Sequence, residues 1–188
     1  MKGDHGSTTL GRDIRALRKA RGVTLQALAG SVGRSVGWMS QVERDISEPT
    51  LVDLQRIAGA LRVPLSLFFG ATPAPVEEAG RIVREASRRT IGEREGGLVE
   101  SLLSPDLTDP FEVVHSLFLP GSARVDPVRR ETSEVAYMVA GTLDVTLSGT
   151  VFTVTAGDSF RVRGEPFSWA NPYAEPAVAV WVIAPPIY

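Results

Sequence analysis

The sequence predicts two domains of different class, an all-α bundle of five short helices followed by an all-β domain. Apolar residues recur at helical spacing up to Phe69, whereas short apolar or alternating runs replace them after residue 80. Turn signals separate these later runs at intervals of roughly 8–12 residues, which is typical of a sandwich or barrel. The length of 188 residues accommodates two small domains.

The first four helices have recognisable ends. Thr24 and Ser35 are placed to cap the second and third helices, and Gly33 supplies the tight turn between them. Thr50 with Asp53 forms a capping box at the start of the fourth helix. The apolar residues that give these four helices their period are Leu10, Ile14, Leu17, Leu25, Leu28, Val32, Met39, Val42, Leu51, Leu54, Ile57, Ala58 and Leu61.

A fifth short helix is expected over residues 63–69, where a proline stands near the start. Residues 71–80 contain two prolines and no periodicity, so they are expected to form a linker. The predicted domains are therefore residues 10–70 and 81–188, with residues 1–9 as a flexible N-terminal tail.

The later half is predicted to consist of short strands separated by turns. Its clearest runs are residues 111–118, 134–139, 143–147 and 177–183. Turn signals lie at residues 120–121, 141–142, 148–149, 157–158 and 171–172. Strand alternation places Glu134, Ala136 and Met138 on one face, and the residues between them on the other.

Composition excludes several classes of function. Residues 1–70 carry ten Lys/Arg and six Asp/Glu, giving +4, whereas residues 71–188 carry ten and sixteen, giving −6. A basic half joined to an acidic half suggests that the first half meets a polyanion. The absence of cysteine excludes disulfides, thiol catalysis and Cys-ligated metals. Since the sequence has neither a membrane-length apolar run nor an apolar core near Met1, we expect a cytoplasmic protein without a membrane partner.

Residues 25–44 resemble the helix-turn-helix of phage repressors, and the resemblance extends over about residues 10–69. It rests on an alanine inside the second helix, the turn glycine Gly33, the capping Ser35, the run Ser-Gln-Val-Glu-Arg, and the Pro-Thr-Leu start of the fourth helix. This family places its third helix in the major groove of double-stranded DNA. The alternative is a generic five-helix bundle.

The resemblance assigns roles to particular residues. The base-contacting positions that it implies are Val36, Gly37, Trp38 and Gln41. Ser40 faces outward or flanks the same face and is also expected to bind DNA. Gln41 can read an adenine edge through a paired donor and acceptor, and Val36 can touch a thymine methyl group. Trp38 fits either a DNA contact or a partial cover of the core. Expected phosphate partners are Thr24, Gln26, Arg34, Ser35 and Arg44, with the backbone amides around Leu25 and Val36.

Two further expectations follow from the same resemblance. Arg18 and Glu43 match positions that pair with each other inside the domain, so we expect an internal ion pair. A single module of this kind makes few DNA contacts. We therefore expect a homodimer that reads two half-sites, roughly 34 Å apart, in a pseudo-palindromic operator.

Residues 121–141 look like the first cupin motif, in which a glycine, two histidines one residue apart, a glutamate and a second glycine follow one another. By spacing, Pro127 and Arg129 stand at the histidine positions, whereas Glu134 is retained. The resemblance covers roughly residues 98–184 and implies a double-stranded β-helix barrel.

Residues 157–172 resemble the second cupin motif, with Phe167 in place of the third histidine. Iron and manganese cupins hold their metal with imidazoles and a carboxylate. Because these imidazoles are missing, we expect no metal, no other cofactor and no catalytic residue. His115 is expected to be a buried or half-buried strand residue, and His5 lies in the tail.

A small barrel without a metal can still enclose one small ligand. The predicted ligand-binding residues are Arg129, Glu134, Met138, Arg161 and Phe167. We expect Arg129 to share the interior with Glu134 and to suit a polar, zwitterionic or anionic metabolite. The alternative is an internal salt bridge that fills the former metal site without any ligand.

Together, the two halves resemble bacterial transcription regulators that place a repressor-like DNA reader before a cupin sensor. That family implies a cupin domain that binds a small-molecule effector and helps to dimerise the protein. One alternative is a metal-dependent cupin enzyme, an oxygenase or isomerase, fused to a helix-turn-helix domain. Another is an architectural or antitoxin-like protein whose β half only dimerises or binds a protein partner.

Overall fold

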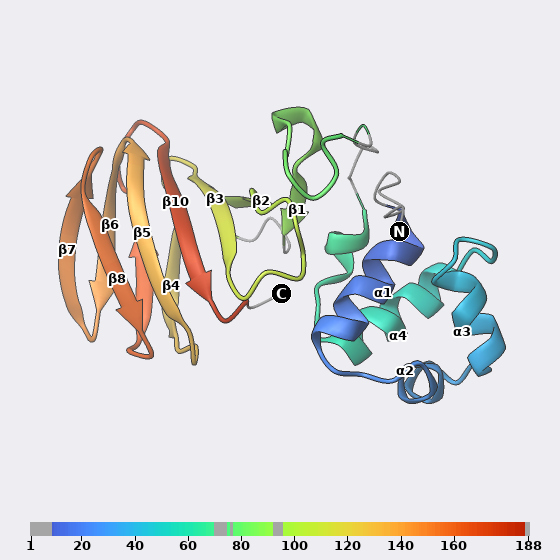
Figure 1. The fold of residues 1–188 in the computed structure, drawn as a ribbon. Coiled ribbons are helices and arrows are strands. Elements are labelled where there is room, and N and C mark those ends of the chain that lie inside the picture. Colours follow the sequence, from blue (N-terminus) through green and yellow to red (C-terminus); the bar gives the residue numbers. More distant parts are fainter. Residues whose placement is uncertain (1–8, 70–74, 76, 92–95, 187–188) are drawn as a thin grey trace. The chain divides into compact units, whose positions relative to one another are not determined.

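The computed structural model describes residues 9–69, 75, 77–91 and 96–186. The chain divides into two compact units, and Figure 1 shows that one is helical and the other is built of strands. The helical unit extends to Arg89 and includes Pro105–Thr108, and the β unit comprises Thr90–Ser104 and the chain from Asp109 onward. Most of the predicted tail, with His5, and residues 71–74 and 76 of the predicted linker lie outside the described residues.

The helical unit contains α1 (Leu10–Ala20), α2 (Leu25–Val32), α3 (Val36–Val42) and α4 (Leu51–Leu61). The expected caps are present, because the side chains of Thr24 and Ser35 accept hydrogen bonds from backbone amides of α2 and α3, at 3.1 Å each. Thr50 and Asp53 form the expected capping box. Gly33 ends α2 with φ of 73°, a conformation that glycine adopts without a Cβ penalty.

The expected fifth helix is wrong as an α-helix. Residues Leu65–Phe68 form only a 3₁₀ turn, η1, in which Leu67 donates to Pro64 at 3.0 Å and Phe69 donates to Ser66 at 3.0 Å. Only four residues lie between Pro64 and Phe69, and Phe69 is already extended, so no α-helical hydrogen-bond ladder develops. The described part of the helical domain therefore has four α-helices and not five.

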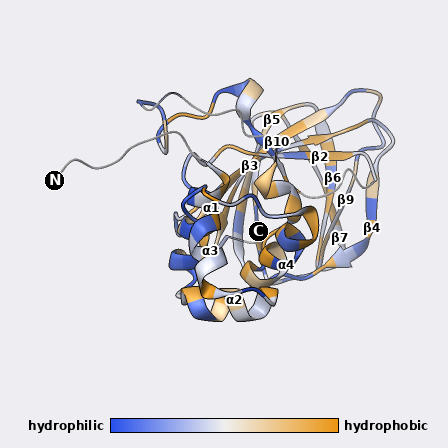
Figure 2. Cartoon of the chain, turned by 90° about the vertical axis from the view of Figure 1, so that its right-hand side faces the viewer, coloured by the Kyte–Doolittle hydropathy of each residue, from blue (hydrophilic) through white to orange (hydrophobic). Residues whose placement is uncertain are grey.

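Apolar side chains from all four helices and η1 form the core of the helical unit. The fully or nearly fully buried residues are Ile14, Leu17, Leu28, Ala29, Val32, Met39, Val42, Leu54, Ile57, Ala58, Leu61 and Leu67. In Figure 2, α4 is largely hydrophobic in colour and α1 largely hydrophilic. Within the described part of the chain, no helix is long and apolar enough to cross a membrane.

Two antiparallel sheets make up the β unit, and their strands lie in two layers (Figure 1). The six-stranded sheet has the order β1-β2-β3-β10-β5-β8, and the four-stranded sheet has the order β4-β9-β6-β7. The strands are β1 (Arg89–Ile91), β2 (Leu98–Leu102), β3 (Glu112–Phe118), β4 (Ala123–Val128), β5 (Ser133–Ala140), β6 (Thr142–Leu147), β7 (Thr150–Thr155), β8 (Ser159–Arg163), β9 (Phe167–Ala170) and β10 (Ala177–Ala184). A short 3₁₀ turn, η2 (Glu85–Ser87), precedes β1.

Strand alternation fixes which side chains face the space between the sheets. On β5, Glu134, Ala136 and Met138 are at most 2% exposed, whereas Val135, Tyr137 and Val139 are about half exposed. The predicted inner face of this strand is therefore confirmed. The register continues across the sheet, since Ile183 on β10 lies opposite Glu134 on one side and Glu112 of β3 on the other.

Candidate nucleic-acid interface and barrel cavity

One face of α3 anchors the helix and the other faces solvent. Met39 and Val42 are at most 1% exposed, as their spacing predicts. Val36 is 44% exposed, and Gly37 and Gln41 are also exposed. Trp38 and Ser40 are half-buried at the flanks of this face. The short helix is thus held by two apolar side chains and leaves a face available to a partner.

Local hydrogen bonds order the end of α3. The Ser47 hydroxyl donates to Oε1 of Gln41 at 2.9 Å, so the Gln41 side chain is held before any partner arrives. A carboxamide oxygen has two lone pairs, and its nitrogen has two donor hydrogens. Gln41 can therefore still present both an acceptor and a donor to a base edge. Arg44 donates from Nε to the carbonyl of Ser40 at 3.1 Å, which keeps this exposed cation beside the helix.

Arg34 is bonded inside the helical unit. Its guanidinium donates to both carboxylate oxygens of Asp53, at 2.9 and 3.0 Å, and lies 5.1 Å from the ring centre of Trp38. The ion pair joins the turn between α2 and α3 to the start of α4. Trp38 packs beside this cation and is half-buried, so its position is compatible with both roles that the sequence left open.

The pairing with Arg34 and the bonds from Thr50 lower the pKa of Asp53 to about 2. Burial of this carboxyl opposes the change and is outweighed, because both of its oxygens accept hydrogen bonds. In an unfolded chain the pKa would be near 3.8, so the ionised form is stabilised by folding.

Asp53→Asn should destabilise the helical unit by about 1–3 kcal/mol at neutral pH, since it removes a charge-assisted pair. The lowered pKa means that the stabilisation is fully present above about pH 4 and disappears as the pH falls through about 2. Urea denaturation of wild type and variant between about pH 2 and 7 measures the difference. A difference that stays constant down to the lowest pH would contradict this assignment.

The expected pair between Arg18 and Glu43 is confirmed. Nη2 of Arg18 donates to Oε2 of Glu43 at 2.8 Å, and Nε donates to Oε1. A further donation from Nη1 of Arg18 to the carbonyl of Val23, at 2.9 Å, fixes the guanidinium. Glu43 is only 6% exposed, so this pair belongs to the core of the unit.

The remaining expected phosphate partners lie at the starts of two helices. Thr24, Gln26 and Ser35 are exposed, and Leu25 is half-buried. Thr24 and Ser35 use their side-chain oxygens as caps, and each hydroxyl keeps a hydrogen to donate. Their contact with phosphate stays a prediction.

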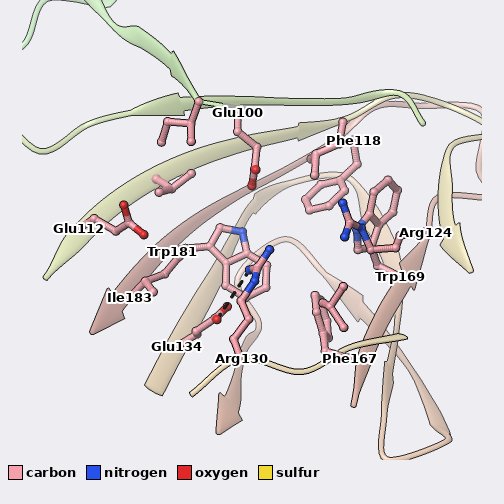
Figure 3. Close-up of a pocket in the computed structure, with 14 residues that line it drawn as sticks. Glu100, Glu112, Phe118, Arg124, Arg130, Glu134, Phe167, Trp169, Trp181 and Ile183 are labelled. Atoms are coloured by element: carbon pink, nitrogen blue, oxygen red, sulfur yellow. Dashed lines mark ion pairs between the residues drawn. The ribbon is translucent and has the colours of Figure 1, made fainter. Parts of the chain in front are cut away.

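A cavity of about 60 Å³ lies between the two sheets of the β unit. Its lining residues come from both sheets and from the segment between β4 and β5: Ile91, Leu98, Glu100, Glu112, Val114, Phe118, Arg124, Val128, Arg130, Glu134, Phe167, Trp169, Trp181 and Ile183. Figure 3 shows the aromatic and charged members of this set around one space.

The cavity includes some of the predicted ligand residues and not others. Glu134 and Phe167 line it, whereas Met138 is buried on the same face of β5 without being a lining residue. Arg129 is exposed and donates to the carbonyl of Gly164 at 3.3 Å. Arg161 is also exposed. The expectation that Arg129 shares the interior is therefore corrected.

Alternation explains the correction. Val128, Arg130 and Glu134 line the cavity, and Thr132 between them is buried, so every second residue of this segment faces inward. Motif spacing pointed to Arg129, but counting back in twos from Glu134 would have identified Arg130. Arg161 points outward for the same reason, because its neighbour Val162 is the buried residue of β8.

The charges in the cavity are partly matched to each other. The Thr132 hydroxyl donates to Oε1 of Glu134, and Nη1 of Arg130 lies 3.7 Å from the same oxygen. Glu100 accepts from the Ser116 hydroxyl at 2.8 Å. Three carboxylates and two guanidinium groups line the space, so carboxylates are in excess.

The residues at the family's metal positions do not suit a metal ion. Glu134 and Phe167 line the cavity, whereas Pro127 and Arg129 are exposed. One carboxylate already bonded to Thr132, together with a phenyl ring, does not form a ligand set. His115 lies on the opposite face of β3 from Glu112 and Val114. Among the residues with described positions, no three His, Asp or Glu side chains form a group that could hold a metal ion.

Comparisons with known proteins match both units. Residues 9–68 match a helix-turn-helix domain family, and residues 114–183 match a cupin domain family. The chain is 28% identical over 157 residues to the HTH-type transcriptional regulator SutR of Escherichia coli (strain K12), covering 83% of each chain. It is 36% identical over 70 residues to the immunity repressor protein of Bacillus phage phi105, covering 37% of this chain and 49% of the repressor. A solved HTH_3 family transcriptional regulator from Vibrio cholerae is 22% identical with a TM-score of 0.46, covering 94% of this chain and 95% of that one.

Proposed function

We propose that α3 of this chain, a helix-turn-helix transcriptional regulator with a C-terminal cupin domain, reads DNA. The helix enters the major groove and presents its exposed face to base edges. The observation that carries this proposal is the division of α3. Met39 and Val42 hold the helix to the core, while Val36, Gly37 and Gln41 stay exposed. In this arrangement Gln41 reads an adenine edge, and Val36 contacts a thymine methyl group.

The phosphate contacts position α3 over its half-site. Thr24, Gln26, Ser35 and Arg44 supply them, with the amides around Leu25 and Val36. Arg34 takes a supporting role, because its guanidinium is bonded to Asp53 and orders the turn before α3. One such module makes few base contacts, so the protein acts as a homodimer on a pseudo-palindromic operator of double-stranded DNA in the cytoplasm.

The cupin domain serves as a sensor and helps the protein to dimerise. Its cavity has an apolar and aromatic wall with five charged side chains, and small-molecule sites combine such a wall with polar groups that orient the ligand. Effector binding favours one arrangement of the dimer and thereby changes how well the two α3 helices fit their half-sites. We assign no enzymatic activity, because the residues at the family's metal positions do not form a ligand set.

Selection of bound fragments from the source genome tests the regulator directly and yields its operator. Affinity for that operator should fall about a hundredfold or more between roughly 50 and 200 mM salt, because counterions are released from the contacted phosphates. Fluorescence anisotropy with the selected operator and a scrambled fragment measures both salt dependence and preference. Equal binding of both fragments at every salt concentration would contradict sequence-specific recognition.

A further inference from the structure

Two hydrogen-bond donors in the cavity have no acceptor among the described residues. The indole Nε1 of Trp181 is buried without a hydrogen-bond partner in this part of the chain, and the whole side chain is only 5% exposed. The guanidinium of Arg124, which also lines the cavity, forms no hydrogen bond or ion pair with any described residue. A buried donor without an acceptor costs about 1–3 kcal/mol, so a bound group that accepts hydrogen bonds would recover this cost.

Two of the carboxylates in the cavity already accept hydrogen bonds from hydroxyl groups of the protein. Oε1 of Glu134 is bonded to Thr132, and Oε1 of Glu100 is bonded to Ser116. Arg130 lies against Glu134, so one guanidinium is already matched to a carboxylate. Arg124 and Glu100 form no ion pair with any described residue, so each keeps an unmatched charge. The space therefore favours a ligand that carries both a negative and a positive charge.

Arg124 lies at one side of the space. Figure 3 shows Arg124 beside Trp169 and Glu112 on the far side, with Trp181 and Glu100 between them. The register places Glu112 and Glu134 on either side of Ile183, and Glu134 is paired there with Arg130. Arg124 comes from the opposite sheet, where it lies opposite Trp169.

We propose that the cavity binds a small amino-acid-like zwitterion, with its carboxylate on Arg124 and the indole N–H of Trp181 and its ammonium group toward Glu100. This inference rests on the proposed sensing role of the cupin domain and names its ligand class. The carboxylate supplies the acceptor that the two donors lack. The ammonium group matches the charge of the Glu100 carboxylate.

The size of the cavity limits the ligand. A volume of about 60 Å³ accommodates roughly four to six water-sized groups, on a scale of about 10–15 Å³ for each. The aromatic rings of Phe118, Phe167 and Trp169 supply apolar wall for a short aliphatic body. An amino acid of the size of alanine meets these limits, whereas a sugar phosphate or a nucleotide is too large.

The test uses the full chain and defined probes. A thermal-shift screen of the twenty proteinogenic amino acids identifies binders, and calorimetry then compares each binder with its two half-molecules. For L-alanine these are propionate, which lacks the amine, and ethylamine, which lacks the carboxylate. We expect at least one amino acid to bind, and each half-molecule to bind about tenfold or more weakly, because each loses one charge-assisted contact.

Variants separate the two ends of the ligand. Arg124→Gln should weaken the amino acid and its carboxylate half-molecule about 10- to 100-fold. Glu100→Gln keeps the bond with Ser116 and should weaken only the probes that carry an amine. Trp181→Phe retains the ring and removes the donor, and should weaken binding about tenfold. Arg161→Gln is the matched control and should change nothing, because Arg161 lies on the outer face of β8.

Three outcomes overturn the proposal: no amino acid binds, an amine alone binds as tightly as the best amino acid, or Arg124→Gln leaves affinity unchanged. Operator binding is measured on the same samples, so failure of the ligand class is distinguished from failure of the regulator. Amino-acid binding that leaves operator affinity unchanged supports the ligand assignment and removes the sensing role. Binding that shifts operator affinity supports both.

Discussion

Gln41→Ala is expected to weaken operator binding about 30-fold or more without unfolding the protein. A bidentate contact between a carboxamide and adenine is worth about 1–3 kcal/mol. A homodimer loses that contact in both half-sites, so the loss is about 2–6 kcal/mol, which corresponds to about 30-fold or more in affinity. The side chain is exposed, and its removal breaks only the bond from Ser47. Thermal unfolding should therefore change little.

Gln55→Ala is the matched control for this experiment. Gln55 is also an exposed glutamine on a helix of the same unit, but it lies on α4 and outside the candidate interface. Its operator affinity should equal that of the wild type. Fluorescence anisotropy then compares the operator with a variant operator that is altered at the contacted adenine. The wild type should bind the two fragments with different affinities, whereas Gln41→Ala should bind them equally. Retained discrimination would place base reading elsewhere.

The parts of the fold that could be predicted are those that short-range chemistry specifies. The caps Thr24 and Ser35 act on amides three residues away, and the buried pair Met39 and Val42 follows from helical spacing. The same holds for the alternation of β5. The predicted fifth helix was wrong because a single turn after Pro64 is too short to develop an α-helical ladder.

Long-range contacts could not be predicted from these signals. Arg34 and Asp53 are 19 residues apart, and they meet only because α4 packs beside the turn before α3. Propensity gives no indication of such a pair, so Arg34 was assigned to phosphate. The resemblance did identify the pair of Arg18 and Glu43, 25 residues apart, because it carries information on tertiary contacts that periodicity lacks.

The residues that line the cavity could likewise not be predicted from local sequence patterns. Arg124 and Trp181 belong to different sheets, and no local pattern indicates that both face one space. Motif spacing led to Arg129, although alternation from Glu134 favoured Arg130. The conflict between these two signals was present in the sequence. The backbone decides it in favour of alternation, since the chain from β4 into β5 presents every second side chain inward.

Arg18→Met is expected to destabilise the helical unit by about 3–5 kcal/mol. The variant keeps a long apolar side chain but leaves the Glu43 carboxylate buried without its partner, and an unmatched buried charge costs about this much. Urea denaturation followed by circular dichroism should show the helical transition at lower denaturant, with the strand signal of the β unit retained.

Two further variants test the physical reason. Arg84→Met breaks an ion pair with Glu78 in which the arginine is 65% exposed, so the unfolding free energy should change by less than about 1 kcal/mol. The double variant Arg18→Met with Glu43→Leu removes both charges and should recover most of the lost stability, because no charge remains to be desolvated. If the double variant is as unstable as the single one, the loss comes from packing around Arg18 and not from the buried charge.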